Sequence, residues 1–383
     1  MKNLAVTLKK VKWKHFINYI AIALVIAIFT PLSLGGSLPL TSRLLLEKIA
    51  MNILLALSLS LVVGFLGELS LGHAGFMCIG AYLGGKVALL LETNFNGDNS
   101  IVPFILALIV GAAVAGLFGF IIGLPALRLK GDYLAIVTLA FGEIVKTVFE
   151  NSSEGTFGGP KGLKTPRFDN IYLFIIGFFL VLLCIFIIQN LIRSKHGRAI
   201  TAIRDNEIAA RAMGINVTKY KLVGFIVSAA FAGAAGVFYS FANNYVRASV
   251  FDYNYSIEIL IMVVIGGMGN LTGTICSAVA VTFVNTKLQT MLTGDLAVLK
   301  DIVYALILVV IIIYNNAPAL KGFREKYNFR NLLNKLFKPK SSTDKDDEGA
   351  WHRVPTKIAM DEVLSIDLKV VESTMNPDKE DKS

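Results

Sequence analysis

The chain has 383 residues, of which 55% are apolar and only 17% are charged, and its formal net charge is +10. Long apolar runs follow one another with short polar breaks, whereas a soluble protein of this size would show amphipathic stripes and charged faces. The basic residues lie beside the apolar runs, where they set orientation and meet anionic lipid, and no nucleic-acid motif accompanies them. The composition therefore predicts an all-α integral membrane protein.

About ten transmembrane or re-entrant helices are predicted, several of them short or interrupted by glycine. They cover residues 16–38, 48–67, 69–91, 101–126, 132–149, 171–192, 220–242, 254–269, 272–290 and 301–316. The first apolar run is too long for a signal peptide and has no small-residue cleavage site after it, so an uncleaved helix is expected. The three cysteines lie far apart in apolar runs, which indicates neither a disulfide framework nor a metal pair.

Charge asymmetry predicts the orientation. Basic clusters precede the first segment and follow the fourth, the sixth and the last, at Lys9–Lys14, Arg128–Lys130, Arg193–Lys221 and Lys321–Lys340. Counting crossings puts all four on one side, which the positive-inside rule makes cytoplasmic, so both termini are expected inside. This divides the chain into a basic N-terminus (1–15), a transmembrane domain (16–316) with a cytoplasmic loop at 193–219, and a polar cytoplasmic tail (317–383) that is expected to be largely disordered.

Glycines dominate "GELSLGHAGFMCIGAYLGG" (67–85). Small residues in a membrane let helices approach closely, break a helix or expose main-chain dipoles to a permeating solute, and polar groups at that depth are costly unless they face protein or water. Tight helix packing is the alternative. The stretch is interpreted as part of a translocation pathway through Glu68, Ser70, Gly72, His73 and Gly75. No second ligand lies at metal spacing from His73, so no metal site is predicted.

A second glycine-rich stretch, "IGGMGNLTG" (265–273), adds Gly266, Gly267 and Gly269 to the candidate pathway, with a tight interhelical turn as the alternative. Glycine and serine interrupt apolar runs at 64–85 and again at 264–277, a weak echo that suggests an internal repeat. Between them, Glu143 and Lys146 are three residues apart on one helical face and are expected to pair or to reach the membrane surface.

Catalysis finds no support in the sequence. No GxSxG, HExxH or clustered acid pair is present, and no GxxxxGK[ST] phosphate loop occurs anywhere in the chain. The chain is therefore predicted not to be an enzyme and to bind no cofactor of its own. If ATP drives its activity, ATP and magnesium bind to another subunit.

The charged stretch "GRAITAIRDNEIAARAMGI" (197–215) falls in the cytoplasmic loop. Asp205 or Asn206 is expected to cap a short helix that stops at Gly214. Its small alanines and scattered charges predict a helix that docks end-on into a groove of a partner, and an ordinary solvated loop is the alternative. The charges that would set the register are Arg198, Arg204, Glu207 and Arg211.

The segment "EIAARAMG" (207–214) resembles the EAA-type loop of bacterial ABC importer permeases, except that Ile208 separates the glutamate from the alanines. The run "GRAITAIRDNEIAARAMGINVTKYKL" (197–222) closely resembles permeases of the branched-chain amino acid importers. So do "LSLGHAGFMCIGAY", "LRLKGDYLAIVTLAFGEIVK", "GGPKGL" and "VVIGGMGNLTG", in that order along most of residues 50–315.

This resemblance implies a permease subunit in the bacterial plasma membrane, working with two ATPase subunits, a second homologous permease and an extracytoplasmic binding protein that delivers branched-chain or other apolar amino acids. It assigns ATPase coupling to Gly197, Arg198, Arg204, Asp205, Glu207, Ala209, Ala210 and Gly214. A urea or short-amide importer permease remains an alternative, as does an ATP-independent carrier or channel that uses Glu68, His73 and Glu143. The substrate and the identity of the second permease stay open.

Overall fold

The computed structural model describes residues 17–35, 39–92, 101–129, 131–166 and 170–291, together with Leu306 and Val309. Within these ranges six helices are long and apolar enough to cross a membrane. They are Leu40–Leu66, His73–Leu91, Ile101–Ala126, Tyr172–Arg193, Val217–Asn243 and Leu271–Met291. Ala21–Ser33 and Tyr253–Gly266 are shorter apolar helices. The prediction of an all-α membrane protein is confirmed, and the count in the described part of the chain is lower than the ten segments expected.

Four of the ten predicted segments account for the difference. Those at 16–38 and 254–269 correspond to the two shorter apolar helices. The segment at 132–149 forms helix α7 (Asp132–Glu150), which carries several charges and is not among the six spans. The segment at 301–316 lies outside the described residues except for Leu306 and Val309, as do the predicted N-terminus and tail. The remaining helices are α2 (Ile17–Leu34), α3 (Leu40–Ser60), α4 (His73–Ile79), α5 (Gly85–Glu92), α6 (Ile101–Ala126), α9 (Asn170–Arg193), α12 (Val217–Asn243), α13 (Tyr253–Gly266) and α14 (Leu271–Met291).

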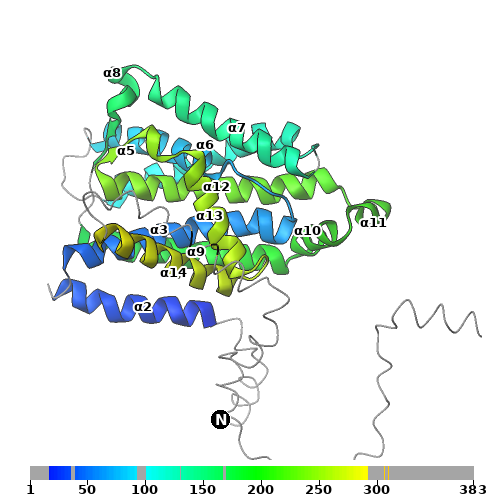
Figure 1. Cartoon of the computed structure of the whole chain (residues 1–383), viewed down its shortest axis with the longest axis horizontal. Coiled ribbons are helices and arrows are strands. Elements are labelled where there is room, and N and C mark those ends of the chain that lie inside the picture. Colours follow the sequence, from blue (N-terminus) through cyan, green and yellow to red (C-terminus); the bar gives the residue numbers. More distant parts are fainter. Residues whose placement is uncertain are drawn as a thin grey trace, which may run out of the picture. The chain divides into compact units, whose positions relative to one another are not determined.

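Helices α3 and α12 form the centre of the bundle (Figure 1). The apolar window of α3 is wholly buried within the molecule. Helix α12 lies against α6, where small residues bring the backbones together: a β-carbon on Gly233 would lie 2.3 Å from the Ala115 side chain, and one on Gly119 would lie 2.6 Å from that of Ala229. In lipid, such close van der Waals packing replaces the hydrophobic driving force as the source of helix association.

Glycine interrupts the helices at two places that meet in space. Helix α3 ends in a π-helical segment, η2 (Leu61–Leu66), followed by a segment without regular secondary structure at 67–72. Helix α13 ends at Gly266, and the turn to α14 contains Gly269. A β-carbon on Gly64 would lie 2.5 Å from the Gly269 backbone nitrogen. The two predicted glycine breaks therefore contact each other through bare backbone.

The other end of the bundle is closed by short elements. Helix α4 continues through a π-helical segment, η3 (Gly80–Gly84), into α5. After α7 come α8 (Glu154–Phe157), η4 (Gly159–Lys161) and strand β1 (Leu163–Lys164), and after α12 come strand β2 (Tyr245–Val246) and η5 (Ala248–Val250). The two strands are antiparallel, with Leu163 opposite Val246. The Thr165 hydroxyl donates to the Ser240 carbonyl at 2.6 Å, which ties this loop to the end of α12.

Candidate functional site

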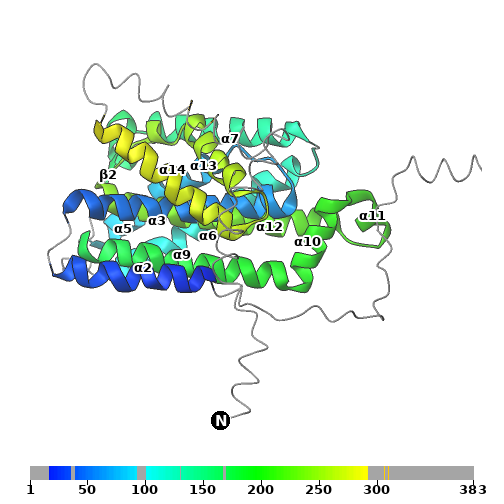
Figure 2. The same cartoon turned by 60° about the horizontal axis from the view of Figure 1, so that its bottom comes forward.

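The charged island consists of two helices, α10 (Lys195–Asp205) and α11 (Glu207–Ala212), which project beyond the membrane helices (Figure 2). Ser194 caps α10 by accepting from the Gly197 amide, and Asn206 caps α11 by accepting from the Ala209 amide at 3.0 Å. Gly214, with φ of +79°, follows the end of α11. The predicted Asn206 cap and glycine stop are both confirmed, because side-chain oxygens satisfy the free amides of a first helical turn.

Helix α10 is anchored to the bundle along one face. Gly197, Ile200 and Ile203 are buried on that face at helical spacing. A β-carbon on Gly197 would lie 2.1 Å from the Ile192 carbonyl oxygen, so this position needs glycine for the chain to turn from α9 into α10. Arg198 on the exposed side donates to the Arg193 carbonyl oxygen at 3.3 Å.

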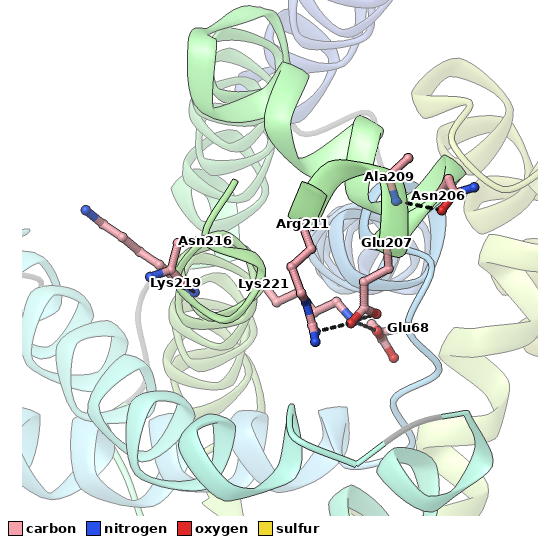
Figure 3. Close-up of polar contacts among 8 residues, drawn as sticks. All are labelled: Glu68, Asn206, Glu207, Ala209, Arg211, Asn216, Lys219 and Lys221. Atoms are coloured by element: carbon pink, nitrogen blue, oxygen red, sulfur yellow. Dashed lines mark hydrogen bonds and ion pairs between the residues drawn. The ribbon is translucent and has the colours of Figure 1, made fainter. Parts of the chain in front are cut away.

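Four charged side chains join α11 to the bundle (Figure 3). The Lys221 ammonium, on the first turns of α12, lies 2.5 Å from a carboxylate oxygen of Glu68 and 2.9 Å from one of Glu207. The Arg211 guanidinium lies 2.6 Å from the second Glu207 oxygen. The Lys221 side chain is only 6% exposed, whereas that of Arg211 is 64% exposed. These four residues, Glu68, Glu207, Arg211 and Lys221, are called the charged cluster. Their two positive and two negative charges balance at the membrane boundary, where an unpaired charge would be costly.

A cavity of about 500 Å³ opens beside this cluster. Its walls come from the 67–72 segment, from α11 and the start of α12, and from Gly131 at the start of α7. The basic loop after the fourth apolar segment therefore shares one end of the bundle with the charged island, as the charge asymmetry predicts.

Two large apolar side chains are exposed on α11 and directly after it. Ile208 and Met213 are each 82% exposed. Ala209 is exposed beside them, whereas Ala210 is buried against Val217 and Ile203. Ile208 also lines the cavity beside the ion pairs, together with Arg211 and Ala212. Large exposed apolar side chains next to paired charges are suited to contact another protein.

Arg204 links the island to the glycine breaks. Its guanidinium donates to the Gly64 carbonyl oxygen at 3.0 Å and pairs with the exposed carboxylate of Asp205 at 3.0 Å. A β-carbon on Gly269 would lie 3.4 Å from the same guanidinium. One side chain of α10 therefore touches both α3 and the turn between α13 and α14.

A model of the family described as "branched-chain amino acid transport system / permease component" matches residues 43–312. That range contains the charged island and every described helix except α2 and the first residues of α3. The chain belongs to this family.

Individual relatives agree with this family assignment. The chain is 39% identical over 259 residues to the high-affinity branched-chain amino acid transport system permease protein LivM of Salmonella typhimurium, and 37% identical to LivM of Escherichia coli, each match covering 59% of both chains. The chain thus spans less than two thirds of the length of these relatives. The ribose import permease protein RbsC of Escherichia coli is 26% identical over 71% of this chain and 84% of its own. No solved structure gives a significant match.

The predicted pathway residues of the permease between 68 and 75 do not share one environment. Glu68 lies in the charged cluster. His73 and Ser70 are buried, and the His73 ring lies 2.7 Å from the Ser58 hydroxyl. A β-carbon on Gly72 would lie 2.2 Å from the Thr138 carbonyl, and one on Gly75 would lie 2.7 Å from Gly142. These glycines lie in close contact with α7, the arrangement expected of the packing alternative; their part in a pathway stays a prediction.

Residues of the second glycine stretch form the α13–α14 turn. A β-carbon on Gly266 would lie 2.5 Å from the Thr274 amide nitrogen, and Gly267 and Gly269 have positive φ angles of +89° and +81°. The predicted Glu143–Lys146 pair is confirmed at 3.4 Å, and Glu143 also accepts from the Tyr253 amide at 3.0 Å. Among the described residues no group of three His, Cys, Asp or Glu side chains is arranged to hold a metal ion.

The motifs of the sequence do not indicate two parts of this site. Lys221 stands there as one end of a basic cluster, although a lysine within an apolar helix requires a partner. Ile208 interrupts a motif in the sequence. In the structure its side chain is exposed, as is that of Met213 directly after α11. The lysine could have been found from its depth in the helix, whereas the exposure of Ile208 depends on how α11 is placed.

Proposed function

We propose that this chain is a membrane-spanning subunit of an importer driven by ATP hydrolysis on separate subunits, and that α11 docks on the ATPase. The observation that carries the proposal is the rigid seating of α11. Ion pairs hold α11 to Glu68 and Lys221, while Ile208 and Met213 are exposed. A docking helix must be held firmly for a push on it to move the bundle.

Force applied to α11 has two direct routes into the membrane. One runs through Glu207 and Lys221 to the start of α12, the helix at the centre of the bundle. The other runs through α10 and Arg204 to the contact between Gly64 and the α13–α14 turn. Different ATPase contacts in the nucleotide-bound and nucleotide-free states would tip these helices between inward-open and outward-open forms.

The proposed assembly contains two ATPase subunits that bind ATP and magnesium, a second homologous permease and an extracytoplasmic binding protein. It lies in the bacterial plasma membrane with both termini of this chain in the cytoplasm. The proposed substrates are branched-chain and other apolar amino acids, a choice supported by the names of the LivM relatives. Because a more distant relative is named for ribose, the substrate requires its own test.

Purification of the tagged full chain from native membranes in mild detergent tests this proposal. We expect an ATPase, a second permease and a binding protein to co-purify, and the reconstituted complex to take up leucine only when ATP is enclosed with the ATPase. Recovery of the chain alone in a form that transports without ATP would contradict the proposal and favour a carrier. Uptake of urea in place of amino acids would contradict the substrate assignment.

A further inference from the structure

A separate cavity of about 440 Å³ lies between α3, α12, α13 and α14. One face of α3 forms its longest wall, with Leu44, Glu47, Lys48, Met51 and Asn52 at helical spacing. Its volume falls in the range of about 300–1,000 Å³ that is usual for small-molecule sites.

This cavity lies at the opposite end of the bundle from the charged cluster. Lys221 lies in the first turns of α12, whereas Asn243, which lines the cavity, ends this helix. The two positions are about 33 Å apart at a rise of 1.5 Å per residue. Likewise, the lining residues of α13 lie in its first turns, and Gly266 at its other end contacts the α13–α14 turn. The cavity is therefore on the side that receives substrate if the island is cytoplasmic.

A hydrogen-bonded polar framework holds the walls together. The Asn52 amide donates to the Thr282 hydroxyl at 2.8 Å and accepts from the Tyr255 hydroxyl at 3.2 Å. The Asn285 amide donates to a Glu258 carboxylate oxygen at 2.7 Å. Asn52 is only 1% exposed and Thr282 is fully buried. Uncharged polar side chains join membrane helices by hydrogen bonds, and ionisable groups among them are costly and mark candidate functional sites.

The charges around the cavity are of both signs. Among the described residues that line it, Glu47 and Glu258 are the carboxylates and Lys48 is the ammonium. Glu47 is only 2% exposed, so its carboxylate faces the interior. Met51, Phe238 and Val250 supply apolar wall beside them.

We propose that this cavity is an amino acid-binding site within the permease, for a zwitterion with an apolar side chain. The substrate ammonium would meet the carboxylates, its carboxylate would meet Lys48, and its side chain would lie on the apolar wall. A neutral ligand such as ribose or urea has no charged groups that could pair with these carboxylates and this ammonium. The inference rests on the proposed amino acid import and adds a second point of selection after the binding protein.

A thiol introduced by Val250→Cys on the cavity wall tests this site, in a Cys276→Ser background that removes an exposed native thiol. The chain is purified with its partner subunits but without the binding protein, and its labelling by a water-soluble thiol reagent is timed. Leucine at ten times its Kd should slow labelling about tenfold, because only about one cavity in ten then stays empty. Leucinol, which lacks the carboxylate, and 4-methylpentanoate, which lacks the ammonium, should protect far less.

Adding Glu258→Gln or Lys48→Gln should abolish protection by leucine. Adding Glu154→Gln, which changes an exposed carboxylate outside the cavity, should leave it intact. Unaltered labelling in leucine, or protection that survives both cavity variants, would overturn the site. Leucine uptake by the complete wild-type importer is measured in parallel. Uptake without protection from labelling would contradict the binding site alone, whereas absence of uptake would contradict the proposed function.

Discussion

At the scale of single residues, Lys221 decides how the island is attached. It lies between two carboxylates from distant parts of the chain, and its ammonium is the group that allows Glu68 and Glu207 to approach each other. Arg211 balances the remaining charge from the exposed side. Glu207 was expected to set the register on a partner; the structure shows that its carboxylate contacts Lys221 and Arg211 within the chain, so its effect on docking would come through the position of α11.

Lys221→Met should therefore destabilise the chain, because it leaves two carboxylates facing each other near the membrane. The expected loss is about 3 kcal/mol, the lower end of the cost of breaking a buried pair, since Glu207 keeps some contact with water. The apparent melting temperature in detergent measures it. Lys161→Met is the matched control, because Lys161 forms an ion pair with Glu154 in which both side chains are well exposed. Equal melting temperatures for the two variants would refute this role of Lys221.

At the scale of elements, α11 combines a fixed inner side with a free outer side. The six residues from Glu207 to Ala212 are too few to be a stable helix alone, so the Asn206 cap and the ion pairs hold it in shape. Its exposed apolar side chains have no role in that attachment. Docking and folding can therefore be separated by substitution on the outer face.

Ile208→Asp should weaken ATPase docking while leaving the bundle intact, because it places a charge at an exposed apolar position and removes none of the ion pairs that hold α11. A loss of about 2 kcal/mol, or thirtyfold in affinity, is expected for an apolar hot spot. Co-purification of the ATPase with the tagged chain measures it, and the melting temperature is the check on folding. Tyr245→Asp, at the other end of α12 and 48% exposed, is the control. Full ATPase recovery with Ile208→Asp would exclude this face as the docking surface.

At the scale of the whole described bundle, backbone contacts connect the island to the membrane helices. Gly64, Gly269 and Arg204 meet at one point, where the end of α3, the α13–α14 turn and α10 come together. The cavity at the other end is lined by α3, α12, α13 and α14. A shift at this contact would therefore be transmitted to helices that also line the proposed substrate site.

Gly64→Ala should separate α3 from the α13–α14 turn, because its added β-carbon would lie 2.5 Å from the Gly269 nitrogen. Overpacking of this kind costs about 1–3 kcal/mol. We expect a lower melting temperature and ATP hydrolysis that is poorly coupled to leucine uptake, measured as leucine transported per ATP consumed. Gly155→Ala, where an added β-carbon meets nothing within 4 Å, should change neither quantity. Unchanged coupling with Gly64→Ala would argue against transmission through this contact.

The features that depend on local order along the chain can be predicted from its amino acids alone. Apolar run length predicted membrane helices, glycine predicted their interruptions, and Asn206 and Gly214 marked the ends of α11, because capping and helix length are properties of neighbouring residues. The Glu143–Lys146 pair followed from helical spacing for the same reason. The charged island stood out because charge is rare elsewhere in the chain.

Tertiary structure alone decided which faces of the helices meet. A helix that is apolar all round, such as α6, gives no periodic signal for its buried side, since lipid and protein core favour the same residues. The contact of Lys221 with Glu68 joins residues 153 positions apart, and the contact of Gly64 with Gly269 involves only backbone. The second cavity likewise arises from four helices whose polar residues look isolated along the chain and become neighbours only when the helices pack.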